Sequence, residues 1–502
     1  MIGRVCLIIP PSPFLLDERV FMSLGILKVA AMLERAEVAV EMLDLSGVEN
    51  YEQVVAAHAS RSDTTCYGLT ATTPQLPAVA RIASTLRQIK PRARLVLGGP
   101  HVTLVHAAFL QERKRGHAHR ASQAFAQLQQ MFDVLVAGDG ELAIFEALRD
   151  DPHSLIDGDN PRSDWFLNNG HLTNLPFPAR HLVDVGSYRY SIDGVRAMSL
   201  IAQLGCPFGC GFCGGRLSPS LRRVRTRPAD NIVQEMAHLY RTYGSQGFMM
   251  YDDELNVNPK MLELMRSIAD VQRQLGVEFR LRGFIKAELF TDQQAEAMYQ
   301  AGFRWILVGF ESGHERILTN IHKKATLAEN TECLNIAKRN GLKVKALMSL
   351  GHPGESRDTI AATRDWLIAT KPDDFDATVI TTYPGTPYFD EAVETRPGIW
   401  TYTFAKTGDR LHSHAVDYSQ VAEYYKGIPG AYQSFVYTDH VAAEELVALR
   451  DTLEADVRSA LTIPYPTALA AIRYEHSMGQ SGLPSSILRS SHTEPARASR
   501  QH

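Results

Sequence analysis

The first 150 residues alternate short apolar runs with longer runs that repeat apolar residues at helical spacing. Short runs rich in Val, Ile and Leu are typical of buried strands. The expected strands cover residues 4–10, 38–45, 66–73, 94–100 and 133–140. The expected helices cover residues 23–36, 51–61, 76–90, 110–130 and 141–151. This alternation predicts a doubly wound, flavodoxin-like (Rossmann-type) domain over 1–150, with ligands bound at the carboxyl ends of its parallel strands.

A second alternating series begins near Arg196. Its strand-like runs cover residues 196–205, 247–254, 278–285, 304–312, 343–351 and 377–384. Six such units predict a partial (β/α)6 barrel of the TIM type over 196–395, with functional loops at the carboxyl ends of its strands. Residues 151–195 are richer in Asp, Asn, Gly and Pro, which predicts a linker.

Beyond residue 395 the pattern weakens. An amphipathic run over 437–462 predicts a helix, and we expect a mainly helical cap over 396–475. The polar residues 476–502 predict a disordered tail. Aromatic and imidazole side chains of this cap either contact a substrate or pack between helices: Tyr402, His412, His414, Tyr424 and Tyr425.

The composition limits the possible partners. A chain of 502 residues with 45% hydrophobic and 22% charged residues can bury the cores of about three domains. Its net charge of −4 argues against a nucleic-acid partner bound through bulk positive charge. No apolar run approaches the roughly 18–20 residues that span a bilayer, and the first residues lack the pattern of a signal peptide. We therefore expect no membrane partner and a cytoplasmic location.

The segment "LGCPFGCGFCGG" holds Cys206, Cys210 and Cys213 at C-x3-C-x2-C spacing, directly after the first barrel strand. Clustered thiolates select zinc, Cu(I) or an iron–sulfur cluster. Structural zinc usually adds a second cysteine pair or histidines, and an electron-transfer cluster usually has four cysteines. Three cysteines suggest a [4Fe–4S] cluster with one open iron; a zinc knuckle, or a redox cluster with a distant fourth cysteine, are the alternatives. The other cysteines lie in apolar runs and are expected as buried small residues: Cys6, Cys66 and Cys333.

The motif, with Phe212 before its third cysteine, resembles that of the radical S-adenosylmethionine (SAM) enzymes. The resemblance implies that the three cysteines are the metal ligands and catalytic centre. It also implies that SAM chelates the open iron and is cleaved there to methionine and a 5′-deoxyadenosyl radical.

Four later segments resemble the SAM-binding segments of that family: "MMYDDEL" (249–255), "GFESG" (309–313), "LGHPGES" (350–356) and "TYPGTPYFD" (382–390). By this resemblance Glu311 binds the ribose hydroxyls. The glycine-glycine motif of many relatives is absent after the second strand, and "YDDE" read alone is equally a solvated acidic turn. The implied SAM contacts are Phe212, Gly214, Tyr251, Asp252, Glu254, Arg282, Glu311, Gly351 and Tyr383.

Two glycine-rich turns end the fourth and fifth strands of the first domain, "LGGPHVT" (97–103) and "AGDGE" (137–141). They resemble the cobalamin-binding domain that precedes the radical SAM domain in one subgroup. Nucleotide binding is the alternative, but no G-x-G-x-x-G follows the first strand. The implied cobalamin contacts are Ser12, Leu16, Asp17, Gly25, Thr72, Thr73, Gln75, Gly98, Gly99, Pro100, His101, Thr103, Gly138, Gly140 and Glu141.

The loop after the first strand, "PPSPFLLDERVFMSLG", lacks the D-x-H-x-x-G histidine that binds cobalt in other cobalamin proteins. We therefore expect cobalamin with its own base displaced and no histidine on cobalt. His101 is expected to hydrogen-bond the corrin edge or its own loop.

The resemblance implies a cobalamin-dependent radical SAM C-methyltransferase of class B type. Such an enzyme uses one SAM to methylate cobalamin and a second to make the radical, and it methylates an unactivated carbon of a small molecule held between the domains. An external electron donor such as flavodoxin or ferredoxin is implied. The Ala- and Arg-rich chain suggests antibiotic biosynthesis, for example C-methylation of an aminocoumarin-type compound. A non-methylating relative that contracts or cyclises rings is the alternative, and a redox iron–sulfur protein is the alternative of another class.

Overall fold

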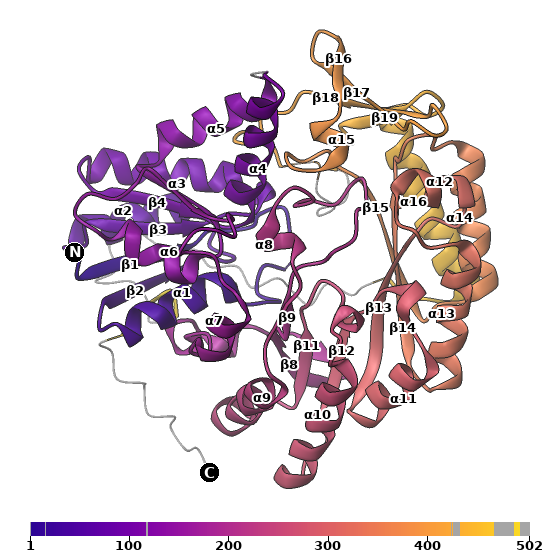
Figure 1. Cartoon of the computed structure of the whole chain (residues 1–502), viewed down its shortest axis with the longest axis horizontal. Helices are drawn as coiled ribbons and strands as arrows, with labels where there is room; N and C mark the ends of the chain where they lie inside the picture. Colours follow the sequence, from indigo (N-terminus) through magenta and orange to yellow (C-terminus); the bar gives the residue numbers. More distant parts are fainter. Residues whose placement is uncertain are drawn as a thin grey trace.

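The computed structural model describes residues 2–15, 17–116, 119–422, 424, 432–465 and 486–491. Figure 1 shows an N-terminal α/β half, in indigo and purple, beside a second half built on a curved sheet, in magenta and orange. Among the described helices, none is both long and apolar enough to cross a bilayer.

The N-terminal half is a seven-stranded sheet in the order β20-β2-β1-β3-β4-β5-β6. Its parallel strands are β1 (Arg4–Ile9), β2 (Ala39–Asp44), β3 (Cys66–Thr70), β4 (Arg94–Gly98), β5 (Val134–Gly138) and β6 (Leu155–Gly158). Its helices are α1 (Leu24–Arg35), α2 (Tyr51–Arg61), α3 (Leu76–Ile89), α4 (Pro100–Lys114), α5 (Arg120–Met131) and α6 (Gly140–Ala147). The order 2-1-3-4-5 confirms the flavodoxin-like prediction.

Alternate residues of β1 serve two cores. Leu7 packs in the core that includes Leu27 of α1, and Ile8 packs in the core that includes Val55 of α2 and Val79 of α3. Because both faces are covered by helices, the strands read as continuous apolar runs.

Three details of this half differ from expectation. The helix expected over 110–130 is split into α4 and α5. β6 lies in the expected linker and pairs with β5. β20 (Leu488–Ser490) pairs antiparallel with β2, so the prediction of a disordered tail is wrong at these residues. Without β20, β2 would be an edge strand with unpaired backbone groups, which gives the pairing its physical reason.

The second half is a sheet in the order β15-β14-β13-β12-β11-β8-β7. Six parallel strands form it, which confirms the partial barrel: β8 (Val195–Leu200), β11 (Gly247–Met250), β12 (Arg280–Phe284), β13 (Phe303–Glu311), β14 (Lys343–Leu350) and β15 (Asp374–Val379). β7 (Ser191–Ile192) adds an antiparallel edge. The accompanying helices are α9 (Ala229–Tyr243), α10 (Met261–Leu275), α11 (Asp292–Gln300), α12 (Glu315–Ile321), α13 (Leu327–Arg339) and α14 (Arg357–Thr370).

The two faces of this curved sheet differ in polarity. Residues on the helix-covered face, such as Leu281, Ile306 and Val344, are fully buried or nearly so. The alternate positions on β12 and β13 include Arg282 and Trp305, which are half-buried. The inward face is therefore unusually rich in charged and aromatic groups for a barrel interior.

The connecting elements are short. They are α7 (Asn169–Asn174), β9 (Gln203–Leu204), α8 (Pro219–Arg222), β10 (Arg225–Thr226) and α15 (Pro387–Asp390). β9 and β10 pair antiparallel on either side of the cysteine segment, so they close its two ends together.

The C-terminal region combines a sheet with a helix. The expected helix is confirmed as α16 (Ala443–Leu461), which packs on α14 and β15. The expectation of a mainly helical cap missed the antiparallel sheet of β16 (Val393–Arg396), β17 (Ile399–Thr403), β18 (Arg410–His414) and β19 (Val436–Thr438), seen above α15 in Figure 1. Tyr402, His412 and His414 lie in this sheet rather than on helices, and Tyr425 lies outside the described residues.

Candidate functional site

The three clustered cysteines lie on one loop between β9 and α8. Backbone hydrogen bonds tie the loop down: Cys206 N donates to Leu221 O at 2.9 Å and Gly211 N donates to Ile321 O at 2.7 Å. At Gly211 a Cβ would collide with the ring of Tyr388, so this position has room only for glycine. The loop is therefore a rigid carrier for the thiols.

Burial keeps these thiols neutral in the metal-free chain. It raises the pKa of Cys206 to about 11 and also raises the pKa of Cys210. Because only the thiolate binds a metal, loading the cluster must displace these protons, so its assembly depends on pH.

The other three cysteines lie in different parts of the fold. Cys6 and Cys66 are buried in β1 and β3 of the N-terminal sheet, and Cys333 is buried in α13. All six cysteines belong to the described residues, and only three of them share the loop. This placement fits a three-cysteine cluster with an open iron better than a closed four-cysteine site.

A buried hydrogen-bonded chain runs from Glu311 to the cysteine loop. Lys323 Nζ lies 3.1 Å from Glu311 Oε1, and Ser349 Oγ lies 2.6 Å from Glu311 Oε2. Ser349 Oγ is also 2.7 Å from His352 Nε2, and His352 Nδ1 is 3.3 Å from the hydroxyl of Tyr388. Tyr388 N then donates to Gly211 O of the loop at 3.1 Å.

The direction of this chain follows from its ends. A carboxylate only accepts, so the Ser349 hydroxyl donates to Glu311 and accepts from His352 Nε2–H. His352 is then a neutral imidazole whose Nδ1 accepts from Tyr388. Burial lowers the pKa of His352 to about 3, which agrees with the neutral form.

Glu311 itself has an unusual backbone. Its φ is +66°, in the left-handed region, and the pairing of β13 with β14 shifts register between Gly309 and Glu311. Non-glycine residues adopt this conformation rarely and often at functional sites. The bulge turns the Glu311 carboxylate to Ser349 on the neighbouring strand.

Two buried lysines flank the loop. Lys286 Nζ lies 4.2 Å from the ring centroid of Phe208 and 3.2 Å from Lys323 O, and it pairs with Glu288 at 2.6 Å. Lys323 and Lys286 both favour the charged form of Cys210 electrostatically. Such cations would offset part of the negative charge of a thiolate-bound cluster.

The acidic segment after β11 divides into different roles. Asp252 Oδ1 accepts from Ala202 N at 2.8 Å and from Gln203 N at 2.5 Å, so Asp252 holds the strand that leads into the loop. Glu254 is buried, its Oε2 has no partner among the described residues, and burial raises its pKa to about 7. Tyr251 is 47% exposed. Asp252 Oδ2 and Glu254 Oε2 are both buried acceptors without a partner among the described residues, so either could meet a ligand ammonium.

The remaining predicted SAM contacts are dispersed. Gly214 meets Leu104 of α4, and Phe212 packs edge-on against His352 at 5.3 Å, both beside the loop. Gly351 has φ +90° and donates its N–H to Glu355. Tyr383 packs instead on Tyr418 and Tyr424, with ring centroids 6.0 and 5.7 Å away. Arg282 lies on the inward face of β12 near Tyr190.

A cavity of about 230 Å³ opens between β1, β3, β4, β5, α1, α4 and α6 of the N-terminal half and β9 and α8 of the barrel half. Predicted cobalamin residues line it: Gly25, Gly98, Gly99, Pro100, Thr103, Gly138, Gly140 and Glu141. Gly68 and Lys28 also line it and were missed; a glycine inside the β3 run was the only signal for the first. At Gly68 a Cβ would lie 2.7 Å from Leu7, so this glycine lets Leu7 pack directly against β3. The cavity is lined largely by glycines and aliphatic side chains, and this slot fits a flat, apolar ring system like the base of cobalamin.

The other predicted cobalamin residues form a hydrogen-bonded rim. Gln75 Nε2 donates to Ser12 Oγ at 3.0 Å, and Gln75 and Thr72 form a capping box. His101 Nδ1 lies 3.0 Å from Thr73 Oγ1, and burial lowers the pKa of His101 to about 4. His101 therefore bonds the neighbouring loop. Asp17 accepts from Arg19 N, and Leu16 lies outside the described residues.

The two halves meet close to both sites. Leu104 of α4 lies beside two glycines of the barrel half: a Cβ added at Gly214 would lie 3.1 Å from its side chain, and one added at Gly385 would lie 2.9 Å from its carbonyl oxygen. Arg120 of α5 lies between the rings of Phe389 and Trp400, at 3.8 and 3.9 Å from their centroids. The glycine-lined cavity and the cysteine loop thus belong to one joined surface.

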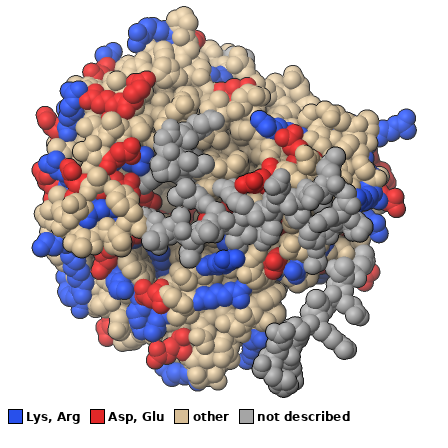
Figure 2. Space-filling model, turned by 180° about the vertical axis from the view of Figure 1, so that it is seen from behind, with Lys and Arg blue, Asp and Glu red and all other residues tan. Residues whose placement is uncertain are grey.

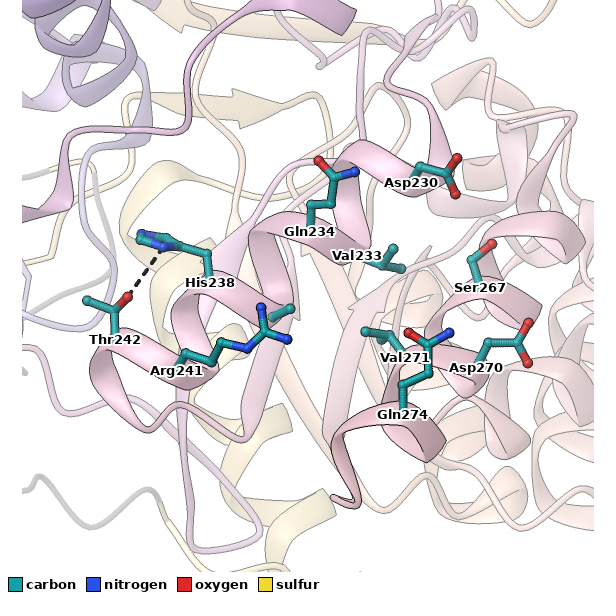
Figure 3. Close-up of a pocket in the computed structure, with 11 residues that line it drawn as sticks. Asp230, Val233, Gln234, His238, Arg241, Thr242, Ser267, Asp270, Val271 and Gln274 are labelled. Carbon is teal, nitrogen blue, oxygen red and sulfur yellow. Dashed lines mark hydrogen bonds between the residues drawn. The ribbon is translucent and has the colours of Figure 1, made fainter.

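A larger groove of about 680 Å³ lies elsewhere, between α9 and α10 on the outside of the barrel. Figure 3 shows its mixed lining, with Asp230 and Asp270 at one end and the hydrogen bond between His238 and Thr242 at the other. Figure 2 views the molecule from behind relative to Figure 1 and shows basic and acidic side chains interspersed on that face.

Two family models match the chain. The radical SAM superfamily model matches residues 200–367, and the B12 binding domain model matches residues 18–129. The first range contains the cysteine loop, Glu311 and His352. The second contains Gly68, Gly98 and His101.

Similar proteins include enzymes of more than one kind. The chain is 25% identical over 394 residues to an uncharacterized methyltransferase of Pyrococcus horikoshii, covering 78% of this chain and 83% of that protein. It is 25% identical over 342 residues to an anaerobic magnesium-protoporphyrin IX monomethyl ester cyclase of Cereibacter sphaeroides, covering 64% of this chain and about half, 52%, of that relative.

A solved structure shares the fold. It is the radical S-adenosylmethionine methyltransferase TsrM of Kitasatospora setae with cobalamin and a [4Fe–4S] cluster bound. The TM-score is 0.59 at 18% identity, over 80% of this chain and 81% of that one.

Proposed function

We propose that the chain methylates an unactivated carbon of a small molecule and consumes two SAM molecules per turnover. The proposal rests on the family to which the chain belongs, the cobalamin-dependent radical SAM enzymes, in which a B12-binding domain is followed by a radical SAM domain. Its cofactors are a [4Fe–4S] cluster, SAM and cobalamin. When bound, the cluster and SAM supply a 5′-deoxyadenosyl radical and cobalamin supplies a methyl carrier.

The observation that carries the proposal is the contact between the two sites. Leu104 lies in the second turn of α4, just after the glycine-rich end of β4. A Cβ added at Gly214, the residue after Cys213, would lie 3.1 Å from its side chain. A substrate held at this junction would face both cofactors at once. Radical capture and methyl delivery need that proximity.

The chain's own groups have separable tasks in this proposal. Cys206, Cys210 and Cys213 bind the cluster. Glu311 accepts the ribose hydroxyls on lone pairs that Lys323 and Ser349 leave free, since each carboxylate oxygen can accept two hydrogen bonds. The glycines of the N-terminal cavity admit the displaced base of cobalamin.

The proposal extends to the surroundings of the enzyme. An external one-electron donor such as a flavodoxin or ferredoxin would reduce the cluster. A reducing, cytoplasmic location fits three thiols that must remain free for iron. A role in antibiotic biosynthesis remains our proposal for the pathway.

A second candidate function is ring formation or contraction without methyl transfer. It is favoured by the similarity to a magnesium-protoporphyrin ester cyclase. The two candidates differ in one product, because only methyl transfer from SAM releases S-adenosylhomocysteine.

The test is an anaerobic incubation of cluster- and cobalamin-loaded enzyme with SAM and a reductant. Methyl transfer predicts S-adenosylhomocysteine that depends on cobalamin, and candidate pathway intermediates gain the mass of one methylene group. Ring chemistry predicts 5′-deoxyadenosine without S-adenosylhomocysteine. If the electron paramagnetic resonance spectrum of the reduced cluster is the same with and without SAM, the result would instead support a redox protein.

A further inference from the structure

Four aromatic rings meet where the N-terminal half faces the barrel. Phe21 lies in the segment between β1 and α1, Tyr190 precedes β7, Tyr251 follows β11, and Phe284 ends β12. The Phe21 ring centroid lies 4.6 Å from that of Tyr190 and 5.0 Å from that of Tyr251, and Tyr251 lies 6.3 Å from Phe284. We call these four residues the aromatic wall.

The aromatic wall is incompletely covered. Tyr251 is 47% exposed, although it directly follows β11, whose four residues are all buried. Phe21, Tyr190 and Phe284 are half-buried. Exposed rings gathered at a junction between domains are typical of binding surfaces for apolar or planar ligands.

One guanidinium lies at the base of this wall. Arg282 Nη1 is 3.4 Å from the Tyr190 hydroxyl, and its guanidinium carbon is 5.5 Å from the ring centroid of Trp305. Its Nε is buried without a hydrogen-bond partner in the described part of the chain. The wall and this cation thus form one surface.

Arg282 differs from the other cations on this face of the sheet. Arg280 lies 3.6 Å from Glu278, Lys343 lies 3.5 Å from Asp193, and Lys345 lies 3.0 Å from Asp374. Within the described residues, no carboxylate lies within ion-pair distance of Arg282. A partly buried charge without a counter-ion is costly, and an incoming anion would relieve that cost.

We propose that the aromatic wall and Arg282 bind the substrate, and that the substrate is a planar ring compound carrying a carboxylate. The ring stacks on the wall, and the carboxylate accepts two hydrogen bonds from the guanidinium, whose fork matches its geometry. The location of this site rests on the proposed function. Arg282 would fix which carbon of the ring compound reaches the cofactors.

The carboxylate has two possible sources, the substrate or SAM itself. The contacts favour the substrate. The neighbours of Arg282 are Tyr190 and Trp305, whereas the groups that contact the cysteine loop are Tyr388, His352 and Lys286. The experiment therefore measures both ligands.

The first measurement is equilibrium dialysis of the anaerobic holoenzyme with three probes. Naphthalene-2-carboxylate has the ring and the charge, naphthalene-2-carboxamide lacks the charge, and decahydronaphthalene-2-carboxylate lacks the planar ring. We expect the first to bind about 10-fold more tightly than either of the others, the size of one charge-assisted contact or one stacked ring. Equal binding of acid and amide overturns the proposal.

The second measurement uses variants. Arg282→Met removes the charge and should abolish the preference for acid over amide, while Arg282→Lys keeps part of it. Arg280→Met, on the same strand and face, is the matched control and should bind like the wild type. Iron and cobalamin contents report folding of each variant. If Arg282→Met loses its cofactors, the result rests on Arg282→Lys, and an undiminished preference in either variant overturns the proposal.

The third measurement separates the two sources. SAM is titrated against the electron paramagnetic resonance signal of the reduced cluster in wild type and Arg282→Met. The substrate assignment predicts midpoints within about 2-fold of each other. Weakened SAM binding with unchanged probe binding assigns Arg282 to SAM and overturns the substrate assignment. None of these readouts needs turnover, so a failure to form S-adenosylhomocysteine would refute the proposed function separately.

Discussion

The two cofactor regions of this molecule are built by opposite means. The N-terminal cavity is lined largely by glycines and aliphatic side chains, among them Gly98, Val96 and Val136. The barrel site is made by putting charged groups in, since Glu311, Lys323 and Lys286 are all buried there. The first selects its ligand by shape, and the second acts by electrostatics in a low dielectric.

This difference predicts different sensitivities. Added volume should damage the cavity and leave the barrel unaffected. Removal of a charge at constant volume should damage the barrel and leave the cavity unaffected. Substitutions at single residues of each region test this contrast.

Cys210→Ala should abolish the cluster. The protein would lose bound iron and sulfide and form no 5′-deoxyadenosine, because two thiolates cannot hold a four-iron cluster that lacks one ligand already. Iron analysis and product chromatography measure this. Cobalamin binding should be retained, since none of the three cysteines lines the cavity. Cys333→Ala is the control; loss of its cluster would make Cys333 the fourth ligand and contradict the three-cysteine site.

Gly98→Val should block cobalamin. Gly98 lines the cavity, and the nearest atom to a Cβ there is 3.7 Å away, so the added methyls project into the slot without straining the backbone. We expect cobalamin affinity to fall by about 100-fold, which corresponds to roughly 3 kcal/mol of binding free energy. Fluorescence-quenching titration measures it, with Gly3→Val at an open position as the control. Unchanged affinity would mean that cobalamin does not use this cavity.

Lys323→Met should weaken SAM binding by about 10-fold, because Glu311 loses the ion pair that holds one of its oxygens. It should also shift the cluster to a lower reduction potential, since a buried positive charge near Cys210 is removed. Spectroscopic redox titration and SAM titration check both effects. The neighbouring Lys324 is exposed, and Lys324→Met should change neither. An unchanged potential in Lys323→Met would argue that the charge acts only through Glu311.

Glu355→Gln should alter the pH dependence of stability. Burial raises the pKa of Glu355 to about 7, above its unfolded value of 4.5, so the native state binds the extra proton. Its contribution is therefore present at low pH and is lost as pH rises from about 4.5 to about 7. Between these pH values the free energy of unfolding should therefore fall by roughly 1–3 kcal/mol less in Glu355→Gln than in the wild type. Denaturant unfolding at several pH values measures this, and parallel curves for the two proteins would contradict it.

The alternation of strands and helices predicted both sheets well, because each of their parallel strands lies in a recognisable apolar run. The C-terminal sheet was missed because its strands lack such a run: β16 is exposed at every position, and β18 has two polar residues among the three buried between its exposed ends. β20 was missed because it is a three-residue strand within a polar tail, and its pairing with β2 depends on a contact between distant segments.

The site was predictable where its residues are neighbours in sequence. The three cysteines and the glycine-rich turns form local motifs. Lys323, Ser349, His352 and Tyr388 come from separate segments and meet only because β13 and β14 are adjacent and the turn after β15 returns to the loop. Likewise, nothing local shows that Asp252 caps the backbone of residues 202–203 rather than facing a ligand.

The most direct test of the central claim is one anaerobic incubation of the reduced holoenzyme with SAM, analysed for two nucleosides. The account predicts both S-adenosylhomocysteine, formed only when cobalamin is bound, and 5′-deoxyadenosine, formed only when Cys206, Cys210 and Cys213 are intact. Formation of 5′-deoxyadenosine with no S-adenosylhomocysteine, whether or not cobalamin is present, would contradict a methyltransferase.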